Sequence, residues 1–259
     1  MRNELDKFYT REEDVKKCLS FINLNDYDLI IEPSAGAGAF SDKIDNCLAY
    51  DILPDNENII KQDFLLLNNI PNAEKILFIG NPPFGKRSGL AKAFIKKAIE
   101  LNAYTIAFIL PNTFKKFNNQ SMFNDSWYLH KIIPTSETFL LNGEEIKIPC
   151  SFFIWSKEYT RNNLRDYKAK EPKEFKIISR NSKTADFSIN GNNGKIKEIK
   201  DITNLKAEHL VKIKDGFDID DIKQKLSKLT YDFNSSVNGG VAWINKNDIY
   251  KTWSERTTT

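Results

Sequence analysis

Short apolar runs alternate with amphipathic stretches between Asp28 and Glu158, and this alternation limits the possible folds more than any other feature. Continuous apolar strands separated by helices are typical of a mostly parallel sheet that helices cover on both faces. In the amphipathic stretch 89–102, apolar residues recur at helical spacing and the lysines fall outside that stripe. We therefore expect an α/β domain. Its strands are expected at residues 28–33, 47–52, 59–64, 75–83, 104–111 and 148–156, and a further helix at residues 12–22.

The composition changes after about residue 158. Residues 160–200 are rich in Lys, Arg and Asn, and their apolar runs are shorter. A chain of 259 residues suffices for one full α/β domain and a modest extension. We therefore expect a domain at residues 1–158 and a small appended region, part strand and part loop, at residues 159–259.

The composition also argues against several classes of protein. Three scattered cysteines and two histidines do not suggest a disulfide framework or a metal site, so no metal is expected. No apolar run resembles a signal peptide or approaches the roughly 18 residues of a membrane span. We expect a soluble intracellular protein, cytoplasmic or, in a eukaryote, nuclear. The net charge of +3 favours polyanionic partners only weakly, and nothing predicts the oligomeric state.

A glycine-rich turn follows the first expected strand, in the segment IIEPSAGAGAF (30–40). Gly36 and Gly38 permit backbone angles that a side chain forbids, and they let a ligand approach the main chain. An adenosine-containing cofactor sits naturally at such a strand-to-helix switch. The spacing fits neither the dinucleotide pattern GxGxxG nor a phosphate-binding loop with GK[ST]. The turn therefore predicts a nucleoside cofactor, with a helix expected after it.

Carboxylates follow three successive expected strands. Glu32 precedes the glycine turn, Asp51 is placed to accept hydrogen bonds from ribose hydroxyls, and Asp63 is placed to accept the adenine amino group. Phe64 is expected to pack against the purine. A single acid at a strand end is equally typical of a helix cap, but three around one glycine turn favour a cofactor site.

The fourth expected strand ends in the segment Asn81-Pro82-Pro83-Phe84, hereafter the NPPF segment. It resembles motif IV, [DNS]PP[YFW], of the amino-methyltransferases. The glycine turn resembles motif I of that family, and KFYT (7–10) resembles motif X, although Arg11 follows where the family often has proline. The motif order resembles the gamma arrangement of N6-adenine methyltransferases, over about residues 6–156.

This resemblance implies a Rossmann-like class I methyltransferase fold with a mostly parallel seven-stranded sheet and S-adenosylmethionine as cofactor. It implies an enzyme that methylates adenine N6 in DNA, or in RNA, by direct transfer to a flipped-out base. The residues implied for the cofactor are Phe8, Tyr9, Thr10, Glu32, Pro33, Ser34, Ala35, Gly36, Gly38, Phe40, Asp51, Ile52, Asp63, Phe64 and Asn81. The catalytic residues are Asn81, Pro82, Pro83 and Phe84.

The chemistry of the reaction explains the NPPF segment. The amine lone pair must turn out of conjugation, and the side-chain oxygen of Asn81 and the carbonyl of Pro82 can hold the two amine hydrogens. Consecutive prolines stiffen the segment, and Phe84 offers a face for the base. No covalent enzyme intermediate is required.

Basic residues follow the fourth and fifth strands on the carboxyl edge of the expected sheet, where loops surround the active site. We expect these residues to contact phosphates of the nucleic acid. They are Lys86, Arg87, Lys115 and Lys116. The region 159–259 stands where a target-recognition domain lies in gamma-type enzymes, and a partner-binding module is the alternative.

Methyltransferases with the same fold also act on other methyl acceptors. In the relatives that methylate guanine N2, histidine follows NPPF, whereas Gly85 follows it here. Relatives that act on protein glutamine favour NPPY, and ribosomal adenine dimethylases have a single proline. These comparisons favour adenine and leave guanine N2, cytosine N4 and protein glutamine as alternatives. A non-catalytic, nucleic-acid-binding partner subunit is the alternative from another class.

Overall fold

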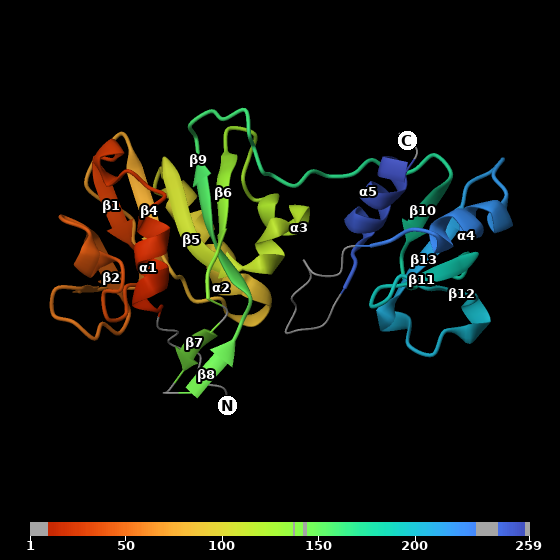
Figure 1. Cartoon of the computed structure of the whole chain (residues 1–259), viewed down its shortest axis with the longest axis horizontal. Coiled ribbons are helices and arrows are strands. Elements are labelled where there is room, and N and C mark those ends of the chain that lie inside the picture. The colour runs from red at the N-terminus through yellow and green to blue at the C-terminus, as the bar shows by residue number, and fades with distance from the viewer. Residues whose placement is uncertain (1–9, 137, 142–143, 232–242, 257–259) are drawn as a thin grey trace. The chain divides into compact units, whose positions relative to one another are not determined.

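The computed structural model describes residues 10–136, 138–141, 144–231 and 243–256. The chain divides into two compact units, Met1–Asp166 and Tyr167–Thr259 (Figure 1). The division thus follows Asp166, eight residues later than the change in composition at residue 158 predicts. The reason is that residues 159–166 bind the first unit. The guanidinium of Arg165 donates to the backbone carbonyls of Phe123 and Trp127, at 2.7 and 3.1 Å.

The first unit is built on a seven-stranded sheet in the order β3-β2-β1-β4-β5-β9-β6. Strands β1 to β5 pair in parallel, whereas β9 runs antiparallel to both β5 and β6. This mostly parallel sheet confirms the predicted Rossmann-like class I methyltransferase fold. The strands are β1 (Leu29–Glu32), β2 (Leu48–Asp51), β3 (Ile60–Lys61), β4 (Ile76–Gly80), β5 (Thr105–Pro111), β6 (Tyr128–Pro134) and β9 (Cys150–Ser156).

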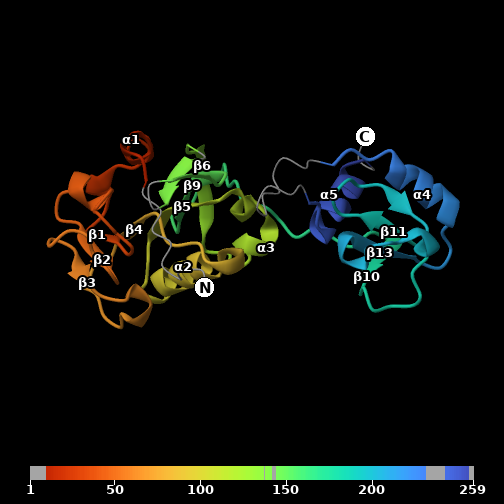
Figure 2. The ribbon, with the colours of Figure 1, turned by 90° about the horizontal axis from the view of Figure 1, so that it is seen from below.

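Helices cover this sheet unevenly. Figure 2 shows α1 (Glu12–Leu19) on one side of the sheet and α2 (Gly89–Glu100) on the other. A third helix, α3 (Phe117–Gln120), is a single turn beyond β5. The described connections from β1 to β2 and from β2 to β3 contain no α-helix, so the helix predicted after the glycine turn is wrong. The single 3-10 turn η2 (Ser41–Lys43) takes its place.

The core of the first unit lies on the central strands. Every residue of β4, β5 and β9 is buried, which is why these strands are continuous apolar runs in the sequence. Helix α2 buries Phe94 and Ile95 against this core, while Lys96 is exposed and Lys92 and Lys97 are half-buried. Toward the β6 edge of the sheet, Phe123 stacks on Trp155 of β9 with ring centroids 4.0 Å apart.

Three strands of the first unit are absent from the sequence prediction, and all six expected strands are shorter than expected. In β6 the polar residues His130 and Lys131 interrupt the apolar pattern at a β-bulge. The strands β7 (Thr138–Leu141) and β8 (Glu144–Lys147) form a separate two-stranded sheet between β6 and β9. Strand β3 spans two residues, because the chain turns at Asp63 into the 3-10 turn η3 (Phe64–Leu66).

The second unit has its own sheet and its own core. Its four strands are in the order β10-β13-β11-β12 and pair antiparallel. Phe175, Trp253 and Ile222 belong to a core cluster that α4 and α5 complete. The elements are β10 (Phe175–Ile178), β11 (Phe187–Asn190), β12 (Ile196–Lys197), β13 (Glu208–Ile213), α4 (Ile219–Ser227) and α5 (Lys246–Arg256).

No helix among the described residues has the length and apolar composition to cross a membrane.

Replacing Gly191 by alanine is expected to destabilise the second unit. A Cβ at Gly191 would lie 2.4 Å from the ring of Trp243, so the ring or the turn must move. We expect the free energy of unfolding to fall by about 1–3 kcal/mol, as for other overpacked sites. Urea denaturation followed by tryptophan fluorescence measures the change. Gly89→Ala is the matched control, because a Cβ there meets no atom within 4 Å, and it should not destabilise the chain. Equal stability of Gly191→Ala and the wild type would contradict the described packing.

Candidate active site

The NPPF segment begins directly after β4, and the glycine-rich turn, residues 33–40, begins directly after β1. Because β1 and β4 are parallel neighbours, both segments leave the sheet at the same edge. The order of the strands reverses between them, with β2 and β3 on one side and β5 on the other. In open α/β sheets, ligands bind at such a switch point, outside the carboxyl ends of the strands.

Gly80 connects β4 to the NPPF segment and passes close to Glu32. Its φ is +145°, and a Cβ at this position would lie 3.3 Å from Cγ of Glu32. A side chain here would therefore be both strained and crowded. Our sequence analysis does not single out Gly80. Its one signal in the sequence is its place directly before Asn81.

Two hydrogen bonds hold Asn81 in place. Its Nδ2 donates to the hydroxyl of Thr10 at 3.1 Å, and its backbone carbonyl accepts from the hydroxyl of Ser34 at 3.3 Å. Its Oδ1 is buried and has no hydrogen-bond partner among the described residues. A buried acceptor without a partner costs free energy, so this oxygen marks a position where the donor of a ligand would fit.

Two carboxylates hold the loops at this edge through backbone amides. Asp51 accepts from the amides of Gly36 and Leu53, both at 2.8 Å, and Glu32 accepts from the amide of Ser41 at 2.7 Å. In a helix such amides would donate to backbone carbonyls. In this turn the amides of Gly36 and Ser41 donate to carboxylates.

Burial has a large effect on the pKa of Glu32, which is 1% exposed. Desolvation raises the pKa of Glu32 from 4.5 to about 7, and the hydrogen bond from the backbone amide of Ser41 opposes this shift without cancelling it. The side chain of Glu32 thus points into the unit and holds the turn in place.

The turn and the tip of β2 have the features that an adenosine group requires. Gly36 has a φ of +56°, and no atom lies within 4 Å of the position that its Cβ would occupy, so the main chain is open there. Each oxygen of Asp51 keeps a further lone pair for a ribose hydroxyl. The side chain of Ile52 is 50% exposed beside it and offers an apolar surface. These residues fit S-adenosylmethionine.

Three residues predicted for the cofactor make structural contacts in the described chain. Phe40 and Phe64 are buried in the core, at 0% and 2% exposure. The carboxylate of Asp63 accepts from the amide of Leu65 at 2.9 Å and caps η3. Contact of Phe64 with a purine would require its ring to leave the core. Phe8 and Tyr9 lie outside the described residues.

The remaining predicted residues lie at the carboxyl edge. Phe84 is 7% exposed, and its carbonyl accepts from the amide of Leu90 at the start of α2. The four basic residues predicted to contact phosphates all follow β4 or β5. Lys86 and Arg87 are exposed, and Lys115 and Lys116 are half-buried.

Neither Cys18 nor Cys47 can serve as a reactive thiolate. Burial raises the pKa of Cys18 and Cys47 to about 12, so both remain thiols at neutral pH. No group of three or more metal-ligating side chains lies together in the described part of the chain. What this edge does offer is a positioned acceptor, Asn81 Oδ1, beside an open glycine turn.

Comparison with known proteins gives a family. The model of a family described as the EDM2 methyltransferase-like domain matches residues 23–163, which include the glycine turn and the NPPF segment. No curated protein matches the chain.

A solved structure from Pyrococcus horikoshii, provisionally described as an RNA methyltransferase, is 14% identical to this chain. The match has a TM-score of 0.43 and covers 56% of this chain and 81% of that one. So distant a likeness says nothing about what this chain acts on.

The raised pKa of Glu32 predicts how stability depends on pH. An acid with a higher pKa in the folded chain than in the unfolded chain weakens the fold as it ionises. The free energy of unfolding should therefore fall as the pH rises from about 4.5 to about 7, with a contribution from Glu32 on the order of 3 kcal/mol. Glu32→Gln should remove this contribution, and the exposed Glu74→Gln should keep it. Urea denaturation at several pH values tests the prediction, which fails if Glu32→Gln has the pH dependence of the wild type.

Proposed function

The chain belongs to the EDM2 methyltransferase-like domain family, and from this premise we propose that it methylates adenine N6 in DNA, or in RNA. The methyltransferase domain is given by the family. The adenine acceptor, the nucleic acid and the roles of single residues are our proposal.

The observation that carries the proposal is the buried, unpartnered Oδ1 of Asn81. An exocyclic amine has two hydrogens, and it becomes nucleophilic when both are held out of the plane of the ring. Asn81 Oδ1 would accept one hydrogen and the carbonyl of Pro82 the other. The bond to Thr10 keeps Nδ2 turned away, so the amide presents its oxygen rather than its nitrogen to the base.

S-adenosylmethionine would supply an electrophilic methyl group when bound. We assign its adenosine to Gly36, Asp51 and Ile52, for which the open main chain, the carboxylate and the exposed apolar side chain are the support. Ser34 connects this half of the site to the other, because its hydroxyl donates to the backbone carbonyl of Asn81. The acceptor amine would then lie between the turn and the NPPF segment, with the chain's own residues serving to orient both reactants.

Adenine is proposed over other amines because of the residues around the motif. The NPPF segment is followed by Gly85, not by histidine, and it ends in Phe84, not in tyrosine. The same site chemistry would serve cytosine N4 or guanine N2, so the nucleoside that carries the methyl group is the decisive product. The basic residues Lys86 and Arg87, exposed directly after the motif, support a nucleic-acid acceptor.

Asn81→Ala should abolish methyl transfer, because it removes the acceptor that activates the amine. We expect kcat to fall at least about 100-fold, as when another preorganised hydrogen-bonding group is removed from an active site. Tritium transfer from labelled S-adenosylmethionine into unmethylated DNA and RNA, followed by nucleoside analysis, measures the rate and identifies the product. Asn118→Ala, on an exposed position of α3, is the matched control and should have wild-type activity.

The affinity for S-adenosylmethionine should remain largely unchanged in Asn81→Ala. Equal loss of transfer and cofactor binding would contradict the separate roles assigned here. Label on another nucleoside would overturn adenine as the acceptor. Cofactor binding without transfer to either polymer would favour a protein acceptor or a catalytically silent partner subunit.

Thr10→Val should lower kcat about five-fold, since it removes a hydrogen bond worth about 1 kcal/mol that fixes the Asn81 amide. Thr10→Ser should restore activity, because it keeps the hydroxyl. Steady-state kinetics with DNA or RNA and calorimetry with S-adenosylmethionine separate the possible causes. If the valine variant instead binds the cofactor more weakly and keeps its kcat, Thr10 serves the cofactor and does not position Asn81.

A further inference from the structure

The two units of the chain have opposite net charge. Residues 167–259 contain 18 Lys and Arg against 13 Asp and Glu, a net charge of +5, whereas residues 1–166 contain 20 against 22, a net charge of −2. The basic character of the whole protein thus resides in the second unit. An excess of positive charge favours polyanionic partners, and the positions of the lysines and arginines decide where such a partner would bind.

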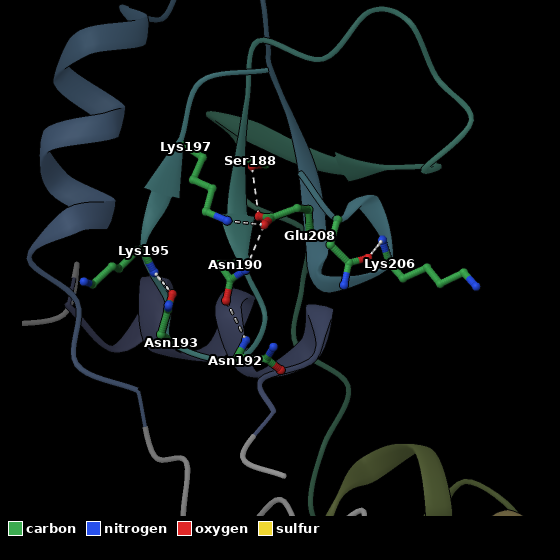
Figure 3. A network of polar contacts seen from close by, with 9 residues as sticks. Ser188, Asn190, Asn192, Asn193, Lys195, Lys197, Lys206 and Glu208 are labelled. Carbon is green, nitrogen blue, oxygen red and sulfur yellow. Dashed lines mark hydrogen bonds and ion pairs between the residues drawn. The ribbon is translucent and has the colours of Figure 1, made fainter. Parts of the chain in front are cut away.

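One acid of the second unit contributes no surface charge. Glu208, at the start of β13, is fully buried and binds three side chains of neighbouring strands (Figure 3). Asn190 Nδ2, Lys197 Nζ and Ser188 Oγ contact its carboxylate at 2.8, 2.9 and 3.0 Å. Desolvation alone would raise the pKa of Glu208, but the hydrogen bonds from Asn190, Lys197 and Ser188 lower it, so the carboxylate is ionised at neutral pH.

This network fixes one end of the sheet, where two turns lie side by side. The turn after β11 donates the amide of Gly191 to the carbonyl of Ala207, which ends the turn before β13, at 2.7 Å. Because Glu208 links β13 to β11 and β12, the two turns form one rigid surface. Its exposed polar residues are Asn192, Asn193, Lys195, Asn204 and Lys206, hereafter the Asn–Lys surface.

Asparagine side chains hold the two turns in shape. Asn193 Oδ1 accepts from the amide of Lys195 at 3.0 Å, and Asn204 Oδ1 accepts from the amide of Lys206 at 3.1 Å. With Oδ1 bound to the backbone, the Nδ2 group of each of these exposed residues can still donate hydrogen bonds. Figure 3 shows Lys195 and Lys206 extending outward on either side of the Glu208 network.

Two further residues border this surface. The ring of Trp243 packs on Gly191 and lies 5.2 Å from the ring of His209. The guanidinium of Arg180 lies 6.0 Å from the centre of the Trp243 ring, and its Nε donates to the carbonyl of Glu208 at 3.1 Å. A further cation is thus fixed beside the turns by the same residue that anchors them.

We propose that the Asn–Lys surface binds the sugar-phosphate backbone of the nucleic acid on which the first unit acts. Lysine ammonium groups neutralise phosphates, and asparagine amides donate to phosphate oxygens and base edges. Two exposed acids lie in the chain between the two turns: Glu198 pairs with Lys223 of α4 at 2.7 Å, and Asp201 follows Lys200. The proposal rests on a nucleic-acid substrate and gives the second unit the task of holding it.

The test compares nucleic-acid binding by the full chain and by the double variant Lys195→Gln/Lys206→Gln. Fluorescence anisotropy with a labelled 20-base-pair DNA duplex and a single-stranded RNA of the same sequence is recorded over a range of salt concentrations. Loss of two phosphate contacts should weaken binding about ten-fold at low salt and reduce the slope of log affinity against log salt by about two. Circular dichroism and thermal unfolding check that the variant is folded.

Lys173→Gln/Lys176→Gln is the matched control, because it removes the same charge from exposed positions before and within β10. It should keep both the affinity and most of the salt slope. Equal weakening by both double variants would overturn the proposal in favour of a diffuse charge effect. Wild-type binding by Lys195→Gln/Lys206→Gln would overturn it directly.

The test also separates this proposal from the proposed reaction. At saturating nucleic acid, Lys195→Gln/Lys206→Gln should transfer methyl groups at the wild-type kcat, because the NPPF segment is unchanged. Methyl transfer with unchanged nucleic-acid binding in this variant would support the proposed reaction and contradict the proposed role of the Asn–Lys surface. Weakened nucleic-acid binding by the variant, together with no methyl transfer by the wild type, would support the role of the Asn–Lys surface and contradict the proposed reaction.

Discussion

The parallel pairing of β1 with β4 is the contact on which the candidate site depends. It places the glycine turn and the NPPF segment at one edge, although about fifty residues separate them in the sequence. The approach is close enough that Gly80 has no room for a side chain beside Glu32. Asn81 follows immediately, and the hydroxyls of Ser34 and Thr10 then hold its backbone and its side chain. Two segments that leave neighbouring strands thus become one site.

Acidic residues at the strand ends of the first unit also hold the loops of this unit in place. Glu32, Asp51 and Asp63 all accept hydrogen bonds from backbone amides of the loops that follow their strands, and Asp51 also accepts from Gly36 in the loop after β1. This takes the place of the helices that usually cover these strands, since the described connections from β1 to β3 contain none. Asp51 can hold a loop and also bind a ligand, because it is half-exposed and each of its oxygens can accept a further hydrogen bond. Glu32 is buried and accepts from the amide of Ser41, so it holds the glycine turn.

In the second unit, too, a carboxylate holds backbone segments together, but here it joins strands of one sheet. Buried Glu208 binds Ser188, Asn190 and Lys197 and so ties three strands together at one end. An ionised group in such a position is stable only because each of its hydrogen bonds is made. The rigid turns that result carry asparagines and lysines on the surface, which gives this unit a defined basic surface in addition to its net charge.

The sequence by itself determined the fold class, the places of the main strands along the chain and the position of the NPPF segment directly after a strand. It did so because buried parallel strands such as β4 and β5 are continuous apolar runs, and because two prolines directly after a strand allow few conformations. Strand β6 escaped prediction because its polar residues and bulge break the apolar pattern. The core positions of Phe40 and Phe64 and the bond from Asn81 to Thr10 were decided only by the tertiary structure. Local sequence does not record which side of a chain faces the core, or which distant hydroxyl meets a side chain, since both depend on how separate strands pack together.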